Sequence, residues 1–193
     1  MIDKKHRKFS KSSPCYQKVY KSETLILGEN SNVKNILSTP EFICPGEQFE
    51  IDVNTILQVS CVSDSSGLIV IDSLDIVVNG AAKFTEFELI EKNGCPNGCP
   101  AGTFSGLISP DEKAITLIYD NFSVDCEGAG VNLKCCMNFF QLVADESNEM
   151  QKINFDVTLR GFASLDEGCG GQFNDNFESK INIGTTLIVK GDK

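Results

Sequence analysis

The nine cysteines of this chain are the residues best suited to do chemistry. Intracellular proteins keep few cysteines unless these bind metal or catalyse a reaction, whereas disulfides accumulate in oxidising compartments. The first fourteen residues have the positive charges of a secretory leader without its apolar stretch. We therefore expect a protein made in a reducing compartment whose cysteines either bind metal there or are oxidised later.

Nine is an odd number, so at least one thiol has no partner within the chain. We expect Cys15 to form an intersubunit disulfide, because it lies in the N-terminal arm, far in sequence from the predicted sandwich, and because nearby Lys11 and Lys18 favour its thiolate. The alternative is a spare exposed thiol. Cys135 and Cys136 are adjacent in one predicted strand, so their side chains face opposite sides of a sheet. The alternation there predicts that Cys135 points inward and Cys136 outward.

The outward position makes Cys136 the second candidate for an intersubunit disulfide. Phe140 and Leu142 share its side of the strand, and two large apolar groups on a solvent face indicate cover by another strand or subunit. The other seven cysteines are candidates for disulfides within the chain, and the sequence assigns no pairing among them. They are Cys44, Cys61, Cys95, Cys99, Cys126, Cys135 and Cys169.

Zinc ligation is the competing use of these thiols. Cys95 and Cys99 are separated by three residues, which fits structural zinc sites, and Cys126 and Cys136 could complete four ligands. However, the sequence has no second short-spaced C-x2-C pair, and the sole histidine, His6, lies near the N-terminus. We therefore expect a disulfide at the 95–99 loop rather than a metal, and no cofactor.

Enzymatic chemistry finds little support in the sequence. A cysteine nucleophile needs a neighbouring base, normally histidine, and His6 lies in a segment expected to be a tail. Nucleotide-binding glycine loops and the G-x-S-x-G motif are absent. Acidic pairs such as Asp72/Asp75 fit solvated sheet faces and turns. We expect neither enzymatic activity nor a small-molecule substrate.

Period-two alternation of apolar and polar residues predicts the fold. It is clearest in residues 49–61, where Phe49, Ile51 and Val53 alternate with polar side chains, and it recurs in 153–159. Turn sequences rich in Gly, Pro, Asn and Asp separate such segments. The pattern predicts an all-β, jelly-roll-like antiparallel sandwich of two sheets with about eight strands. The remaining predicted strands are 67–79, 83–91, 101–109, 114–123, 131–143 and 181–189.

Charge divides the chain into two predicted parts. The first 21 residues contain seven Lys or Arg and one Asp, so they carry +6, and the remaining 172 residues carry −16 of the total −10. We expect a basic N-terminal arm over 1–38 and a sandwich over 39–193. The arm is a solvated tail, a nucleic-acid or lipid contact, or a connector that docks on the acidic body of the next copy. Its interface candidates are Tyr16, Val19 and Tyr20.

The body's negative charge argues against nucleic acid or an anionic membrane as partner, and no apolar run approaches the ~18 residues of a membrane span. The polar arm with Cys15, the strand series and Cys136 in LKCCMNFF together resemble the cysteine-rich, leaderless β-sandwich proteins of endospore surfaces. That group includes coat and exosporium proteins and appendage-fibre subunits. The resemblance implies subunits made in a reducing mother cell, joined by an N-terminal connector and locked by disulfides after lysis. Connectors of that type often carry two cysteines, where this arm has one.

The sequence therefore predicts a structural subunit that self-assembles into a disulfide-locked homopolymer at a spore surface or outside the cell. Strand addition by residues 15–27 is one expected route, because main-chain pairing gives affinity and tyrosines give anchors. A viral structural jelly roll is a variant of this hypothesis. The alternatives are a zinc-stabilised intracellular β-domain that binds a protein and, last, a cysteine-dependent enzyme.

Overall fold

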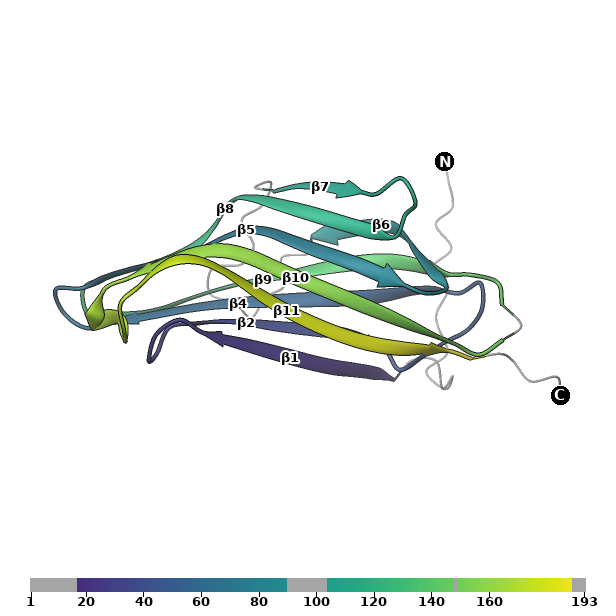
Figure 1. Cartoon of the computed structure of the whole chain (residues 1–193), viewed down its shortest axis with the longest axis horizontal. Coiled ribbons are helices and arrows are strands. Elements are labelled where there is room, and N and C mark those ends of the chain that lie inside the picture. The colour runs from purple at the N-terminus through teal and green to yellow at the C-terminus, as the bar shows by residue number, and fades with distance from the viewer. Residues whose placement is uncertain (1–16, 90–103, 148, 189–193) are drawn as a thin grey trace, which may run out of the picture.

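The computed structural model describes residues 17–89, 104–147 and 149–188, and β-strands make up most of these segments (Figure 1). The strands form two sheets packed face to face, as predicted. The described residues contain one short 3-10 helix, Glu167–Cys169, and no helix long and apolar enough to cross a membrane. The all-β sandwich class predicted from the alternation is confirmed.

Sheet A has five strands in the order β1-β2-β4-β9-β6, and sheet B has six in the order β3-β11-β10-β5-β8-β7. The pairings are antiparallel except for β3 with β11, which is parallel. Sheet A contains β1 (Lys18–Ile26), β2 (Asn32–Pro40), β4 (Gln48–Cys61), β9 (Gly130–Ala144) and β6 (Ala82–Leu89). Sheet B contains β3 (Phe42–Ile43), β11 (Phe173–Leu187), β10 (Gln151–Leu165), β5 (Ser66–Asn79), β8 (Ala114–Glu127) and β7 (Phe104–Ile108).

From β4 to β10 the chain crosses between the sheets at every step except the β7–β8 hairpin. This alternation is typical of Greek-key and jelly-roll-like sandwiches. It brings the alternating apolar side of each strand into one shared core. In β4, for example, Ile51, Val53 and Leu57 are fully buried while their neighbours are half-buried on the outer face.

The core also contains polar side chains that hydrogen-bond to one another. Thr55 Oγ1 donates to Asn35 Oδ1 at 2.9 Å, and Asn35 Nδ2 donates to Ser179 Oγ at 3.3 Å, so this chain of bonds links sheet A to sheet B. Asn138 Nδ2 donates to the Tyr119 hydroxyl at 2.8 Å, again between the sheets. Such buried bonds fix how the two sheets align, because a misaligned sandwich would leave the polar groups unsatisfied.

The long strands give the sandwich two distinct ends. We call the loop end the one formed by residues 27–31, 62–65, 128–129 and 166–172, where backbone pairing and hydrogen bonds join all four loops. We call the terminal end the opposite one, where β1 begins and β11 ends (Figure 1). A fourteen-residue strand such as β4 spans about 46 Å at ~3.3 Å per residue, so the two ends are far apart.

The arm predicted for residues 1–38 is wrong for residues 18–38. β1 pairs with β2 along its whole length, and β2 pairs with β4, so both strands belong to sheet A. Val33 and Leu37 are fully buried in the core, and Val19 and Leu25 pack against it. Polar composition concealed these strands, because the half-buried edge strand β1 needs few apolar residues and the interior strand β2 buries polar residues such as Asn35 and Ser38. With β1, β2 and β3, the described residues contain eleven strands.

The facing of β9 is also opposite to the prediction. Cys136, Phe140 and Leu142 are buried in the core, whereas Cys135 and Met137 are half-buried on the outer face. The strand carries large apolar residues on both faces, so alternation alone does not choose between them. Asn138 departs from the alternation of apolar core and polar surface residues, because this polar side chain faces the core and donates a hydrogen bond to Tyr119 there.

Candidate functional site

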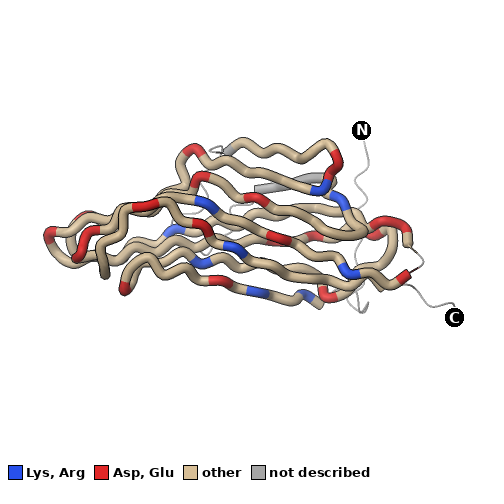
Figure 2. Tube along the Cα trace, in the orientation of Figure 1, with Lys and Arg blue, Asp and Glu red and all other residues tan. Residues whose placement is uncertain are grey.

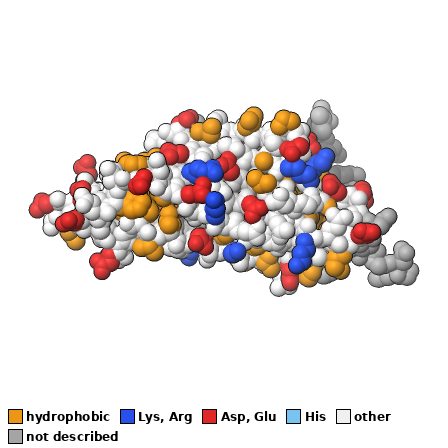
Figure 3. Space-filling view, in the orientation of Figure 1, with side chains coloured by type: hydrophobic (Ala, Val, Ile, Leu, Met, Phe, Trp, Pro, Cys, Tyr) orange, Lys and Arg blue, Asp and Glu red, His pale blue; other side chains and the backbone are white. Residues whose placement is uncertain are grey.

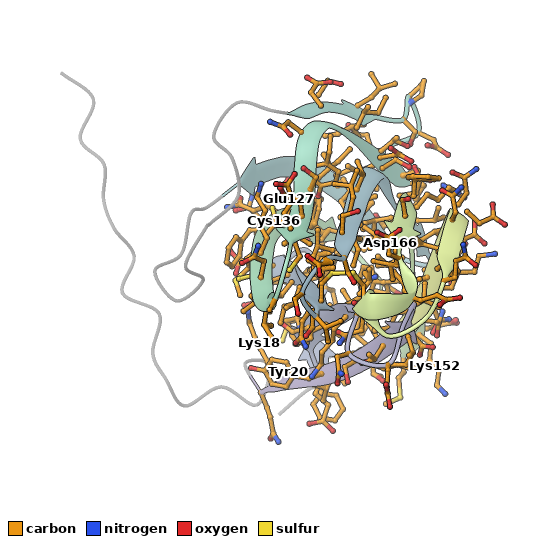
Figure 4. The ribbon with its side chains drawn as sticks, turned by 90° about the vertical axis from the view of Figure 1, so that its left-hand side faces the viewer. Lys18, Tyr20, Glu127, Cys136, Lys152 and Asp166 are labelled. Carbon is orange, nitrogen blue, oxygen red and sulfur yellow. A yellow bond between two sulfur atoms is a disulfide. The ribbon has the colours of Figure 1, made fainter. Side chains whose placement is uncertain are left out.

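The loop end carries an exposed cluster of acidic side chains. Its four loops contain no Lys or Arg, and Figure 2 shows only acidic positions marked at this end of the trace. Figure 4 views the molecule from this side, with Glu127 at the end of β8 and Asp166 directly after β10 labelled. We call these residues the acidic loop end: Glu29, Asp64, Asp125, Glu127, Asp166 and Glu167, all of them exposed.

Backbone hydrogen bonds hold these loops against one another. Glu29 N donates to Gly170 O at 2.6 Å, Val62 N donates to Gly168 O at 2.8 Å, and Gly128 N donates to Ser65 O at 2.8 Å. The like charges of the acidic loop end are thus fixed by links between loops distant in sequence. Fixed like charges attract a basic partner more effectively than charges on mobile loops, because little ordering accompanies binding.

Three sulfur atoms lie beneath these acids. Cys61 at the end of β4 and Cys169 in the β10–β11 loop form a disulfide, 108 residues apart in sequence. Cys126, near the end of β8, is a buried free thiol. The disulfide ties a strand of sheet A to a loop of sheet B, so it fastens the two sheets together at this end.

The terminal end uses charge to fasten the edge strand β1. Lys18 Nζ donates to Asp52 Oδ2 at 2.8 Å and lies 3.7 Å from Glu50 Oε1, while Ser38 Oγ donates to Asp52 Oδ1. Partial burial lowers the pKa of Lys18, but the hydrogen bond to Asp52 and the charges of Asp52 and Glu50 outweigh burial, so the net shift is upward. These contacts span from β1 across β2 to β4.

The outer edge of β1 is open in the described part of the chain, since its only described neighbour in the sheet is β2. Tyr20 and Ile26 are 69% and 65% exposed, and they share the outer face of this strand. A long edge strand with exposed apolar residues is able to pair with another strand. Lys21 and Glu23 on its other side place charges that limit such pairing.

The outer face of sheet B combines an ion-pair network with exposed apolar residues. Arg160 pairs with Asp75 and, at 3.0 Å, with Glu178, which also contacts Lys180 at 2.6 Å. Figure 3 shows apolar side chains along the upper edge of this face. Leu107 on β7 and Ile118 on β8 are exposed, and the register of the β7–β8 pair places them on the same face of sheet B.

The predicted cysteine roles are partly revised. Cys61 and Cys169 pair with each other, and Cys44 and Cys135 are also disulfide-bonded, whereas Cys126 is not. The outward, intersubunit role predicted for Cys136 is contradicted, since this residue is 2% exposed and already disulfide-bonded. The predictions for Cys15, Cys95, Cys99 and Tyr16 lie outside the described residues.

The predicted interface side chains divide between surface and core. Tyr20 is exposed and Val19 is half-buried, both on β1. Phe140 and Leu142 are fully buried and take no part in any surface. The alternative zinc set is contradicted at Cys136, because a disulfide sulfur is not a thiolate ligand. The described residues contain no cluster of three or more potential metal ligands.

Sequence reasoning missed the acidic loop end and the position of Cys126. The acids come from four segments that are separate in sequence, and only the pairing of strands brings these segments together. A signal was nevertheless present, since the turns SDSSG, CEGAG and DEGCGG carry acids without bases. The pairing of Gly67 with Cys126 has no counterpart in the sequence pattern.

A family model described as "Domain of unknown function (DUF4360)" matches residues 90–186, half of the chain. No curated protein sequence matches the chain. Among solved structures, the seventh ScaB type I cohesin from Pseudobacteroides cellulosolvens is 10% identical, with a TM-score of 0.42 over 79% of this chain and 88% of that one. BcpA, the major pilin subunit of Bacillus cereus, is also 10% identical, with a TM-score of 0.37 over 89% of this chain and 40% of that one. Neither likeness carries an argument about function.

Proposed function

The chain belongs to the DUF4360 family, and we propose that it is a non-enzymatic structural subunit that assembles head to tail. In this proposal, residues 1–17 of one copy bind the acidic loop end of the next. Two observations carry the proposal: the acids gather at the loop end, and the described chain, which follows a basic stretch of sequence, starts at the opposite end of the sandwich. The described chain starts at the terminal end, and the acids lie about 46 Å away at the loop end.

Charge complementarity supports the docking of residues 1–17 on the acidic loop end of another copy. Residues 1–17 contain five Lys or Arg and one Asp, a net +4, and the acidic loop end contributes six negative charges. A heterologous contact between two different surfaces of identical copies gives a filament unless the rotation between copies closes a ring. The open edge of β1, with Tyr20 and Ile26, offers a second surface along which neighbouring copies can pair.

Seventeen residues can extend about 56–60 Å, so a tail could also fold back onto its own loop end. Protein concentration separates the two cases. Intermolecular docking gives species that grow with concentration in sedimentation velocity and as filaments in electron microscopy. Particles that stay monomeric at every concentration would rule out the assembly, whatever the tail contacts.

Removal of residues 1–17 tests the basic partner. The sandwich keeps all its described strands, because β1 begins at Lys18, so the shortened chain should fold and stay monomeric. Circular dichroism checks the fold, and sedimentation velocity checks the state. Filaments that persist after this deletion would exclude the tail as connector.

Charge neutralisation tests the acidic partner. The variant Glu29→Gln/Asp64→Asn/Glu127→Gln/Glu167→Gln removes four negative charges from the acidic loop end and leaves Asp166, which accepts hydrogen bonds from Ser66. We expect it to lose assembly, and we expect wild-type assembly before oxidation to weaken from 50 to 500 mM salt. The matched control removes four exposed charges elsewhere, at Asp72, Asp120, Glu146 and Glu149, and should assemble normally. Equal behaviour of the two variants would refute specific docking.

Oxidation would make the assembly permanent, and Cys15 is the thiol that we propose joins neighbouring copies. Cys15→Ser should still assemble but dissociate in detergent without reductant. Cys126→Ser is the matched control, because it also removes one thiol and leaves the tail intact. Covalent ladders that are unchanged in Cys15→Ser on a non-reducing gel would exclude this link.

A spore surface or another oxidising exterior is the compartment we propose. The disulfide-bonded state of Cys44, Cys61, Cys135, Cys136 and Cys169 supports it, since reducing cytosol disfavours so many disulfides. Immunogold labelling of sporulating and vegetative cells tests the location. A protein found reduced in the cytoplasm of vegetative cells would contradict it.

A further inference from the structure

Cys126 is a buried thiol to which the proposed assembly gives no role. It lies near the end of β8 with 3% of its surface exposed. Its sulfur is 3.4 Å from Gly130 O at the start of β9 and 3.6 Å from Gly128 O in the turn before that strand. Gly130 is the register partner of Cys61 in the β4–β9 pair, so Cys126 approaches the strand position opposite the disulfide.

Gly67 gives a second, independent measure of that closeness. It is the register partner of Cys126 in the β5–β8 pair, so the Cβ positions of the two residues are about 4.5–5.5 Å apart on the same face. A Cβ built on Gly67 would lie 3.1 Å from Cys61 Sγ and 3.1 Å from Cys169 Sγ. Because Gly67 has no side chain, the space above it is occupied by Val59 Cγ2, 2.7 Å from the same Cβ position, and by the two disulfide sulfurs.

From these contacts we propose that Cys61, Cys126 and Cys169 form a thiol–disulfide exchange centre. The Cys126 thiolate attacks Cys61 Sγ, a new bond forms between Cys126 and Cys61, and the bond between Cys61 and Cys169 breaks. Cys169 leaves as a thiolate and takes up a proton from water, which replaces the one that Cys126 lost. One disulfide and one thiol are present before and after, so the step needs no oxidant or reductant.

The surroundings of the two disulfide partners favour Cys169 as the leaving sulfur. Cys61 is fixed in β4 by its pairing with β9. Cys169 lies in a loop with Gly168, Gly170 and Gly171, the last two at φ of 92° and 137°, where glycine gives the backbone freedom to adjust. Ser31 Oγ donates to Cys169 O at 3.1 Å, which retains the loop while its sulfur moves.

The exchange has a structural consequence. Before the exchange, the disulfide joins β4 to the β10–β11 loop and the free thiol is on β8. After it, the disulfide joins β4 to β8 and the free thiol is in the β10–β11 loop. Cys169, rather than Cys126, then becomes the group that reacts with an external thiol reagent. This inference does not depend on the proposed assembly, since a monomer would show it equally.

Disulfide mapping tests the exchange in the full-length oxidised protein. Samples are held between pH 6 and pH 8.5, quenched with acid, and alkylated with N-ethylmaleimide in denaturant at pH 5, where exchange is slow. Mass spectrometry of proteolytic peptides should find both Cys61–Cys169 with alkylated Cys126 and Cys61–Cys126 with alkylated Cys169. The initial rate of interchange should rise with pH over this range, because the thiolate is the nucleophile.

Two variants keep the outcome decisive. Cys126→Ser should abolish alkylation of Cys169 without changing the circular dichroism spectrum. Cys169→Ser leaves Cys61 and Cys126 as thiols, and oxidised glutathione should join them if the sulfurs are within reach. The matched control Cys126→Ser/Cys169→Ser should form no such bond. Exclusive Cys61–Cys169 linkage in the wild type at every pH, or a folded Cys169→Ser that never links Cys61 to Cys126, would overturn the proposal.

Discussion

The two ends of the sandwich are held together by different physical means. At the loop end, a disulfide and loop-to-loop backbone bonds tie distant segments beneath a set of exposed acids. At the terminal end, β1 is joined to β2 by backbone pairing, and its first residue, Lys18, forms a partly exposed ion pair with Asp52 and Glu50. Between them, Asn35, Thr55 and Ser179 join the sheets by buried hydrogen bonds.

This difference separates the part of the molecule that must stay rigid from the part that can adapt. A covalent tie keeps like charges together despite their mutual repulsion, whereas a solvent-exposed ion pair contributes little and can be rearranged. A fixed acidic surface at one end and a more loosely fastened strand at the other suit a subunit that presents one preformed surface. Removal of each tie in turn should reveal the gradient of stability from the loop end to the terminal end.

Removal of the Cys61–Cys169 disulfide should have the largest effect. The double variant Cys61→Ala/Cys169→Ala removes a crosslink between residues 108 apart in sequence and should lower the free energy of unfolding by about 2–5 kcal/mol. Urea denaturation followed by circular dichroism measures the change. Cys126→Ala is the control for loss of a buried sulfur without loss of a crosslink. A double variant within about 0.5 kcal/mol of this control would show that the loop end is not held by its disulfide.

Loss of a bond in the middle of the core should have the next largest effect. Thr55→Val keeps the shape of the side chain but removes the donor to Asn35 Oδ1, so a buried amide oxygen loses that hydrogen bond. We expect a cost of about 1–3 kcal/mol in urea denaturation. Thr24→Val, on the exposed face of β1, makes the same chemical change at the surface and should stay within about 0.5 kcal/mol of wild type. Equal effects of the two substitutions would contradict a structural role for the buried bond.

High pH tests the same core through Tyr119. Burial raises the pKa of Tyr119 above its ordinary value, although its bond with Asn138 acts in the opposite direction. The folded state therefore retains the phenolic proton that the unfolded chain loses above about pH 10, so this contribution to stability is present below pH 10 and falls as pH rises. The loss should reach about 1.4 kcal/mol by pH 11.

Comparison with Tyr119→Phe isolates this contribution. The variant loses the hydroxyl's bond at every pH, but its stability should fall less steeply than that of wild type between pH 9.5 and pH 11. The exposed Tyr20 provides the control, since Tyr20→Phe should keep the wild-type slope. Parallel curves for wild type and Tyr119→Phe would mean that the hydroxyl is not held in its neutral form by burial.

The sequence predicts the sandwich well because alternation in strands such as β4 and β10 reports directly which side chains enter the core. It fails in β9, where apolar residues occupy both faces and Asn138 is buried by a partner on another sheet. It also fails in β1, whose polar composition is typical of both a tail and a solvated edge strand. The acidic loop end and the closeness of Cys126 to the disulfide depend on strand register, which no local pattern specifies.

The smallest effect should come from the terminal end. Lys18→Met keeps the aliphatic stem of the side chain but removes the charge that meets Asp52 and Glu50. Because the Lys18 side chain is 35% exposed, solvent screening limits the expected loss at pH 7 to about 0.5 kcal/mol.

The pH dependence gives a second check on this ion pair. Because the pKa of Lys18 is raised in the folded state, the stability that its charge contributes is complete below the ordinary pKa of 10.5 and is lost as pH rises further, so wild type and variant should converge above that value. Lys152→Met, which removes another terminal-end lysine from the exposed start of β10, is the control and should change stability by less. A loss as large as that from Thr55→Val would contradict the contrast between the ends, because it would mean that charge fastens β1 as strongly as buried bonds fasten the core.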